Sequence, residues 1–269
     1  MSSGRDPDAA RSRTSVALVT GAASGIGLEL VRELVQRGAP RIYAGVRDLS
    51  TVQSQFDGLP VELLELDITN PVHVTAAAAQ CSDVTLLINN AGYTSSQRLI
   101  CTDDESAARK EMEVNYFGTL AMIRSLAPVL ARNGGGCIAN VLSVVATIPF
   151  PVAGGYSASK AAALFLSSVA RAELMDQKTA VVSLIVGAVD TKMAAHVQGY
   201  KQKPQDIARA MLYAIDHGIE VFDTDPMAVA ARASHALDPA RYRLALARQL
   251  QRDEVSVGSG SGGPEDGNQ

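Results

Sequence analysis

The sequence predicts an α/β fold, a doubly wound parallel β-sheet with helices on both faces. Six short runs rich in β-branched residues alternate with longer segments of helical periodicity, as in a series of right-handed βαβ units. Several of these runs are apolar at successive positions, which is typical of parallel strands buried on both faces. With 269 residues, 47% of them apolar and 19% charged, the chain is suited to one large globular domain and is not disordered.

The expected elements alternate along the chain, and Gly38 stands where a helix C-cap glycine is expected. Strands are expected at 16–19, 42–44, 61–66, 84–88, 137–141 and 180–186. Helices are expected at 25–37, 71–80, 104–131, 155–176 and 205–217. A single domain, 14–255, is therefore expected between a flexible polar N-terminal tail, 1–13, and a flexible Gly/Ser-rich C-terminal tail, 256–269.

Charge and cysteine content argue against several function classes. A net charge of −4 gives no basic surface for nucleic acid or for an anionic membrane. Cys81, Cys101 and Cys137 are widely spaced and lack a CxxC pair, so buried reduced thiols are expected and no metal site. The N-terminus has no apolar secretory core, and Asn140 and two prolines interrupt the uncharged stretch 137–153. The protein is expected to be soluble and cytoplasmic.

A glycine-rich turn joins the first strand to the first helix. In TGAASGIG, Gly21 permits a sharp turn, Gly25 lets the backbone approach a pyrophosphate, and Gly27 lets helix and strand pack closely. The helix N-terminus then presents unpaired N–H groups to the phosphates. These glycines could mark a tight turn alone, and their spacing is not GxGxxG. The strand before them and the helix after them favour nucleotide binding.

An ordered set of motifs resembles the short-chain dehydrogenase/reductase superfamily, in its compact single-domain subfamily, over about residues 14–225. The motifs are TGAASGIG, Asp67 within LDITN, Asn89-Asn90-Ala91-Gly92, Asn115 within MEVNYFG, Ser143, and Tyr156-Ser157-Ala158-Ser159-Lys160. A lone YxxxK is common by chance, whereas the ordered set is highly specific. The resemblance implies a single-domain Rossmann fold. It also implies an NADPH-dependent oxidoreductase that transfers a hydride between nicotinamide and a ketone, aldehyde or secondary alcohol.

Residue chemistry agrees with this reaction. Tyr156 and Lys160 are four apart on a helix, so both point from one face. A lysine cation beside a tyrosine is expected to lower the phenol pKa from ~10, which suits Tyr156 as proton donor or acceptor. The resemblance implies that Ser143 hydrogen-bonds the substrate oxygen, that Lys160 also holds the nicotinamide ribose, and that Asn115 orders a relay water. Taken singly, each of these residues also has a purely structural interpretation. Tyr156 could be a half-buried tyrosine and Ser143 a strand-end cap. Lys160 could be a solvated helix lysine, and Asn115 a buried asparagine that closes a helix irregularity.

The cofactor is expected to be NADP(H). By the pattern of the family, Val46 stands where an acid selects NAD, and Arg47 follows it and can bind a 2′-phosphate. Asp48 argues for NAD instead, because a carboxylate there could bind the free hydroxyls of a ribose without a 2′-phosphate. The resemblance assigns cofactor contacts to Gly21, Ser24, Gly25, Ile26, Gly27, Arg47, Asp67, Ile68, Asn89, Asn90, Ala91, Gly92, Tyr156, Lys160, Val189 and Thr191. Val186 replaces a proline that is usual in the family, which leaves the following loop less determined.

The candidate pocket residues are mainly apolar and predict an apolar carbonyl substrate. They are Tyr93, Thr94, Val145, 150–153 and 193–200. The short loop 192–204 predicts a small lid. Imine reduction is an alternative, as is a non-catalytic NADP-sensing protein of the same fold, although Tyr156 and Lys160 are both present. The resemblance further implies a homodimer or homotetramer in which helices 104–131 and 155–176 pair across a two-fold axis, unless those faces pack on the sheet.

Overall fold

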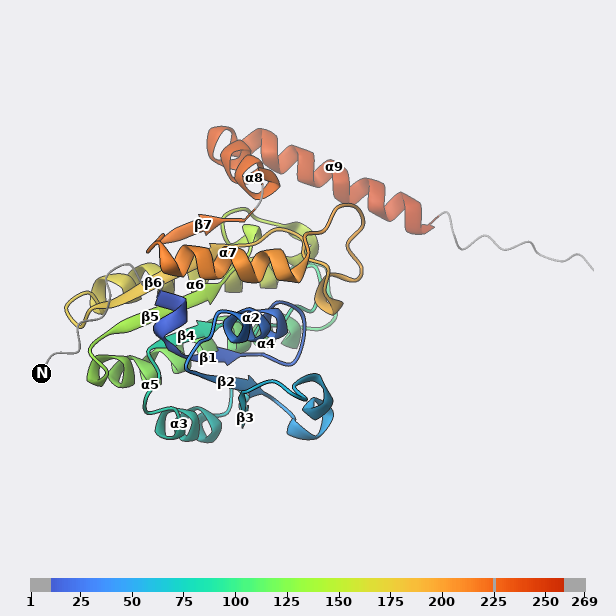
Figure 1. The fold of residues 1–269 in the computed structure, drawn as a ribbon. Coiled ribbons are helices and arrows are strands. Elements are labelled where there is room, and N and C mark those ends of the chain that lie inside the picture. Colours follow the sequence, from blue (N-terminus) through green and yellow to red (C-terminus); the bar gives the residue numbers. More distant parts are fainter. Residues whose placement is uncertain (1–10, 225, 259–269) are drawn as a thin grey trace, which may run out of the picture.

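The alternating pattern folds as a seven-stranded parallel sheet, seen in a computed structural model that describes residues 11–224 and 226–258 (Figure 1). Its strand order is β3-β2-β1-β4-β5-β6-β7, so strand addition reverses between β1 and β4. The strands are β1 (Val16–Thr20), β2 (Arg41–Val46), β3 (Glu62–Glu65), β4 (Leu86–Asn89), β5 (Gly136–Val141), β6 (Thr179–Ile185) and β7 (Val221–Asp223). The predicted doubly wound α/β fold is confirmed, and all six predicted strands are present.

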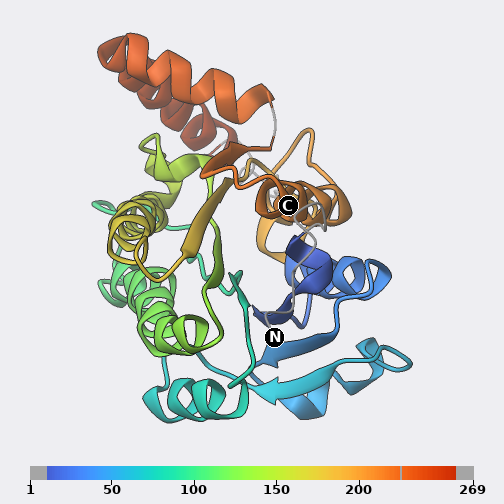
Figure 2. The same ribbon diagram turned by 60° about the vertical axis from the view of Figure 1, so that its left-hand side comes forward.

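Helices cover both faces of the sheet (Figure 2). One face carries α2 (Gly25–Gln36) and α7 (Pro204–Asp216), and the other carries α3 (Pro71–Gln80), α5 (Thr119–Arg132) and α6 (Gly154–Glu173). Leu34 of α2 and Met211 of α7 are fully buried on the first face, and Met122 and Leu126 of α5 are fully buried on the second. The carboxyl ends of the strands are left open between these layers, and an open α/β sheet binds ligands there.

The long helix predicted at 104–131 is interrupted in the structure. It consists of α4 (Ser106–Met112), the π-helical segment η3 (Glu113–Gly118) and α5. A π segment inside an α-helix frequently occurs at a functional site. The combined helix Ser106–Arg132 is long and apolar enough to cross a membrane by length and composition, but half of its most apolar stretch is buried, as in a core helix.

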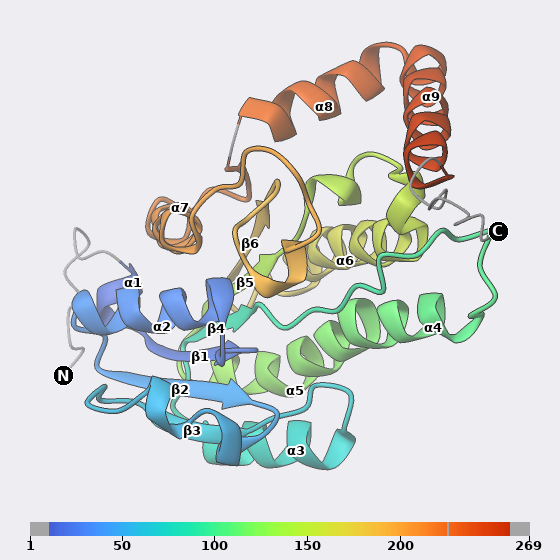
Figure 3. The same ribbon diagram turned by 90° about the vertical axis from the view of Figure 1, so that its right-hand side faces the viewer.

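One strand at the end of the region covered by the resemblance and two helices beyond it were not predicted from the sequence. Beyond β7, α8 (Pro226–Leu237) and α9 (Pro239–Gly258) lie together at the end of the sheet (Figure 3). Leu237 and Leu244 are exposed, so these helices lack the continuous buried stripe that identifies a core helix. The predicted start of the C-terminal tail at 256 is wrong, because α9 continues to Gly258; residues 259–269 lie outside the described residues.

The thiols follow the prediction only in part. Cys81 and Cys137 are buried, and burial raises the pKa of Cys81 to about 12 and that of Cys137 to about 11. Both side chains therefore pack as small unreactive apolar groups. Cys101, in contrast, is exposed, which corrects the expectation of three buried thiols.

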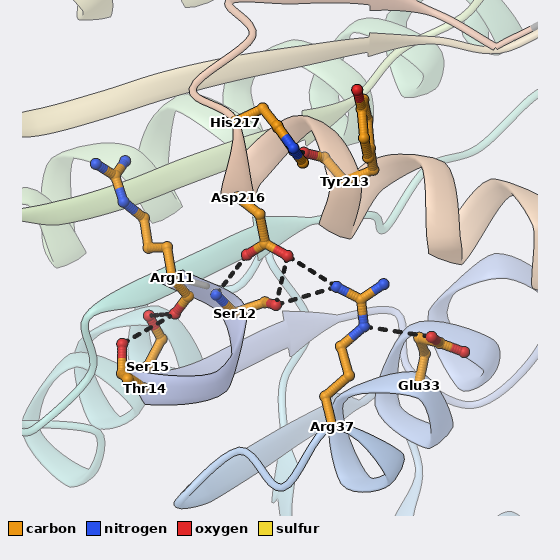
Figure 4. Close-up of polar contacts among 9 residues, drawn as sticks. All are labelled: Arg11, Ser12, Thr14, Ser15, Glu33, Arg37, Tyr213, Asp216 and His217. Carbon is orange, nitrogen blue, oxygen red and sulfur yellow. Dashed lines mark hydrogen bonds and ion pairs between the residues drawn. The ribbon is translucent and has the colours of Figure 1, made fainter. Parts of the chain in front are cut away.

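The predicted N-terminal tail, 1–13, is also wrong at its end, because α1 (Arg11–Thr14) packs against α7 (Figure 4). Ser12 is fully buried. Its N–H and its hydroxyl donate to the Asp216 carboxylate at 2.7 and 3.0 Å, and Arg37 donates to the same carboxylate at 2.9 Å. This network joins α1, α2 and α7, and residues 1–10 lie outside the described residues.

We expect Asp216→Ala to lower the free energy of unfolding by about 2–3 kcal/mol, because it leaves three donor groups without their acceptor. The Asp216 side chain is only 11% exposed, so water replaces the lost contacts poorly. Urea unfolding measures the change. The control is Asp206→Ala on the same helix, since that side chain is 58% exposed and its loss should change stability little. Equal urea concentrations at the unfolding midpoint for the two variants would show that the network around Asp216 adds no stability.

Candidate functional site

The glycine turn leaves the N-terminus of α2 open to an anion. Gly21 has φ +64°, and a Cβ there would lie 2.8 Å from the Ala91 Cα, so this position requires glycine. Ser24 is the N-cap residue of α2, but its side chain makes no capping hydrogen bond. The first N–H groups of a 12-residue helix thus face outward together with its positive dipole end. This observation fits the pyrophosphate of a dinucleotide, and it places Gly25, Ile26 and Gly27 at the phosphates.

The asparagines after β4 hold the protein backbone. Asn90 donates through Nδ2 to the carbonyls of Thr20 and Gly21 at 3.0 and 3.1 Å, and so fixes the glycine turn. Asn89 donates to Asn140 on the neighbouring strand at 2.9 Å and is 5% exposed. Both side chains thus hold the protein itself, and the cofactor contacts expected of Asn89 and Asn90 stay predictions. Gly92 lies near Lys160, because a Cβ on Gly92 would lie 3.5 Å from the Lys160 Nζ.

The residues that follow β2 decide which ribose group could be held at this edge of the sheet. Arg47 is exposed just beyond β2, and Val46 is buried. Asp48 accepts from the Ser50 N–H and hydroxyl at 2.9 and 2.6 Å, and these bonds lower its pKa. The carboxylate that could have held a ribose diol is thus engaged in capping its own turn. The arrangement fits a 2′-phosphate at Arg47 better than a bare ribose.

Asp67 and Ile68 lie beside this position. Burial disfavours the Asp67 charge, but hydrogen bonds from Thr69 and the positive charge of Arg47 outweigh it and lower the Asp67 pKa. Thr69 donates to the carboxylate through N–H and hydroxyl at 2.9 and 2.7 Å. The Ile68 side chain packs against Gly118 in the core. Ile68 could therefore contact an adenine through its backbone only.

Ser143, Tyr156 and Lys160 meet at the carboxyl end of β5. Ser143 follows β5, and Tyr156 and Lys160 lie on the first turns of α6. Tyr156 is partly buried and is hydrogen-bonded to Ser143. Lys160 is 5% exposed, donates to the Val141 carbonyl at 3.0 Å, and has its Nζ 5.8 Å from the centre of the Tyr156 ring. The sequence prediction that these three residues share one site is matched by their positions.

The expected effect of the lysine on the tyrosine is not found. Burial raises the Tyr156 pKa to about 12, the hydrogen bond with Ser143 lowers it, and the negative charge of Glu111 raises it further. Burial also lowers the pKa of Lys160 to about 8. Burial disfavours the lysine cation, and its Nζ donates to the Val141 carbonyl, so Lys160 is not among the groups that shift the Tyr156 pKa. Tyr156 is therefore protonated at neutral pH and is suited to donate a proton.

Asn115 occupies the π-helical segment, and its side chain is used by neighbouring protein groups. Its Oδ1 accepts from the Tyr93 N–H at 2.9 Å, and its Nδ2 donates to the Tyr93 carbonyl at 2.8 Å and to the Ser159 hydroxyl at 2.9 Å. Thr119 donates to the Asn115 carbonyl at 2.9 Å. The Asn115 side chain thus closes a helix irregularity, as in the structural interpretation of this residue given above. It also fixes the backbone of Tyr93 beside the site.

The loop after β6 returns to the glycine turn despite the missing proline. The backbone of Val189 pairs with Gln202, and this closes the base of the loop. The hydrogen bonds of that bridge use the Ala188 carbonyl and the Asp190 N–H, so the Val189 N–H points away from Gln202. The Thr191 methyl carbon lies 3.0 Å from the position of a Cβ on Gly25. Thr191 is thereby placed beside the N-terminus of α2, and the nicotinamide contacts expected of Val189 and Thr191 stay predictions.

An apolar cavity of about 580 Å³ is lined by residues that neighbour Ser143 and Tyr156 in the sequence, but not by Ser143, Tyr156 or Lys160 themselves. Val145, Phe150 and Pro151 of the predicted pocket line it, whereas Tyr93, Thr94, 152–153 and the segment 193–200 do not. Its other walls are residues that sequence reasoning missed, including Leu99, Ile100, Ile148 and Leu250 of α9. These residues carry no motif, and Leu250 reaches the cavity only through the unpredicted packing of α9. Within the described residues, no group of three or more metal-ligating side chains is found.

Known proteins are similar to this chain in sequence and in fold. The family model described as short chain dehydrogenase matches residues 15–201. An uncharacterised oxidoreductase of Staphylococcus haemolyticus is 30% identical over 210 residues, which cover 74% of this chain and 90% of that protein. Dehydrogenase/reductase SDR family member 7B of Mus musculus is 31% identical over 200 residues, which cover 68% of this chain and 60% of the mouse protein.

A solved structure is also similar. The crystal structure of a short-chain dehydrogenase from Burkholderia cenocepacia in complex with NADP has a TM-score of 0.83 and 41% identity, and the match covers 88% of this chain and 98% of that chain. The family model covers well over half of this chain, and it includes the glycine turn, Ser143, Tyr156 and Lys160. The chain therefore belongs to the short-chain dehydrogenase/reductase family of oxidoreductases.

Proposed function

We propose that this protein is an NADPH-dependent carbonyl reductase, equally an alcohol dehydrogenase in reverse, that acts on mainly apolar ketones, aldehydes or secondary alcohols. The observation that carries the proposal is the meeting of hydrogen-bonded Ser143 and Tyr156 with Lys160 at the strand edge that also holds the open α2 N-terminus. The NADP named for the Burkholderia cenocepacia structure supports the choice of cofactor. We also propose that the protein acts in the cytoplasm.

The chemistry of the site follows from the protonation states of its residues. A bound nicotinamide supplies the hydride to the carbonyl carbon. Tyr156, whose pKa of about 12 keeps it protonated, gives its proton to the carbonyl oxygen, and Ser143 donates a hydrogen bond to that oxygen. Lys160, with a pKa near 8, holds a proton at neutral pH close to the tyrosine ring. In the oxidation of an alcohol, Tyr156 must first lose its proton, and the tyrosinate then accepts the proton of the alcohol hydroxyl.

The cavity supports an apolar substrate. Val145 is two residues from Ser143, and Ser157 is next to Tyr156, so residues adjacent to both catalytic groups line it. Leu99, Ile148 and Leu250 provide apolar walls. A volume of about 580 Å³ is within the range of sites that bury a drug-sized molecule. The carbonyl substrate is thus proposed to carry an apolar body larger than a short alkyl chain.

The proposal is tested by following NADPH oxidation with a panel of ketones, aldehydes and cyclic imines that differ in apolar bulk. We expect bulky apolar ketones or aldehydes to be reduced with higher kcat/KM than acetone-sized ones. Reduction of cyclic imines alone would favour imine reduction on the same site. Tight NADPH binding without turnover of any compound would favour a cofactor sensor, and absence of NADPH binding would contradict both.

We also propose a homodimer or homotetramer formed through α5 and α6. Leu126 and Ala170 are buried against the sheet, so those parts of the predicted helix faces are unavailable. Phe117, Phe165 and Val169 are instead 49%, 75% and 52% exposed, and they leave apolar surface available to a partner. Light scattering at micromolar concentration should give a dimer or tetramer mass, and Phe165→Glu should shift it towards the monomer. A monomeric parent protein would contradict this assembly.

A further inference from the structure

Glu111 is a buried carboxylate to which the proposed reaction assigns no role. It lies in α4 and is 1% exposed. Its Oε1 accepts from the N–H and the hydroxyl of Ser95 at 2.7 and 2.8 Å. Among the side chains that the structure describes, no Lys, Arg or His forms an ion pair with it. A buried charge without a cation is costly, so its retention calls for an explanation from its surroundings.

The first turn of α6 provides one part of that explanation. Glu111 Oε2 lies against Gly155, where a Cβ would clash with it. Ala153, the N-cap residue of α6, provides no side-chain hydrogen bond, so the N-terminus of this 20-residue helix is otherwise uncapped. A carboxylate at that end is stabilised by the helix dipole. The negative charge of Glu111 is therefore held one residue before Tyr156.

Glu111 also forms one of two adjacent clamps on the segment after the NNAG motif. Asn115, four residues further along the helix, holds both backbone groups of Tyr93 and bonds Ser159 of α6. Glu111 holds Ser95 and lies against Gly155, four residues before Ser159. The segment 93–95 is thus fixed between α4 and α6 at two points. The second clamp carries a charge, although a neutral glutamine would also reach Ser95.

The charge has a direct consequence for the catalytic tyrosine. Glu111 raises the Tyr156 pKa, whereas the Ser143 hydrogen bond lowers it. The other titratable or charged groups around the pair are Lys160 on α6, Lys110 over the Tyr93 ring, His196 near Ser96, and Arg98, Asp104 and Glu105 along a small cavity that Glu111 also lines. None of these six groups is a cause of the shift in the Tyr156 pKa, whereas Glu111 is.

We propose that Glu111 is a positioning residue that fixes segment 93–95 against the start of α6 and places a negative charge one residue before Tyr156. The inference rests on the proposed role of Tyr156, and it adds a residue outside the recognised motifs. The charge disfavours tyrosinate, which is the base that alcohol oxidation requires, so Glu111 shifts the onset of that direction to higher pH.

The charge effect is tested without substrate or cofactor. The phenol is made more acidic by 3,5-difluorotyrosine at position 156, and its ¹⁹F shift is followed against pH. We expect Glu111→Gln to move the midpoint to lower pH by about 0.5–1.5 units, as one charge removed at short range predicts. The control Glu113→Gln removes an exposed charge two residues away and should leave the midpoint unchanged. An unmoved or higher midpoint in Glu111→Gln would overturn the inference.

Two further measurements separate the clamp from the charge and from the proposed function. Hydrogen exchange in segment 93–97 should accelerate in Glu111→Ala, remain slow in Glu111→Gln, and be unaffected in Glu113→Ala. Equal exchange in Glu111→Ala and the parent would refute the clamp. In kinetics, Glu111→Gln should shift the pH profiles of both reaction directions to lower pH. A shifted ¹⁹F midpoint with a parent that turns over no carbonyl compound would sink the proposed function but retain the role of Glu111.

Discussion

Tyr156→Phe is expected to lose roughly 10²–10⁴-fold in kcat for carbonyl reduction while it binds NADPH nearly as well as the parent. The substitution removes one oxygen, which is the proton donor hydrogen-bonded to Ser143. The ring remains, so its packing 5.8 Å from the Lys160 Nζ is preserved. Single-turnover kinetics measure the loss, and NADPH fluorescence titration measures the binding.

Tyr116→Phe is the matched control, because Tyr116 lies in the neighbouring segment η3 and packs edge-on against Phe117 at 4.9 Å between ring centres. It should keep kcat within about threefold of the parent, since general acid–base catalysis is not removed. If Tyr156→Phe kept more than about a tenth of the parent kcat, the assigned proton transfer would be wrong. A parallel loss in both variants would point to a folding defect, which thermal unfolding would reveal.

The sheet could be predicted because its strands carry a strong local signal. Runs such as 137–141 and 180–186 are apolar at most positions, which is typical of strands buried on both faces of a sheet. The site could be placed for a related reason. Parallel strands all end at the same edge of the sheet, so motifs that follow successive strands converge there.

The parts that were not predicted depend on contacts between distant segments. The π-helical turn at Asn115 arises where its side chain bonds Tyr93 and Ser159, so helix propensity alone gives no sign of it. In α1, the only fully buried side chain is Ser12, which is held by Asp216 from 204 positions away. The pKa of Tyr156 was misjudged for the same reason. Sequence spacing showed the lysine four residues away, but neither its burial nor the approach of Glu111.

Cofactor preference should depend on Arg47, and the parent protein is expected to favour NADPH over NADH by about ten- to a hundredfold in kcat/KM. A charge-assisted hydrogen bond to a 2′-phosphate raises affinity by about that factor. The preference should be smaller at high salt, because Arg47 is exposed. Arg47→Ala should abolish most of the preference through the KM for NADPH. Arg32→Ala, which removes a cation paired with Glu29 on α2, is the control and should leave the preference intact.

Reversal of the preference requires a carboxylate as well as the loss of the cation. Val46→Asp combined with Arg47→Ala should favour NADH, although Val46 is 1% exposed, so part of the gain will be offset by lower stability. Asp48 already supplies a nearby carboxylate, but Ser50 engages it through two hydrogen bonds at 2.9 and 2.6 Å. Asp48→Asn should therefore leave the NADPH preference of the parent unchanged. Equal use of NADH by the parent, together with loss of NADH activity in Asp48→Asn, would show that Asp48 turns into the ribose site and that the Ser50 contacts do not hold it.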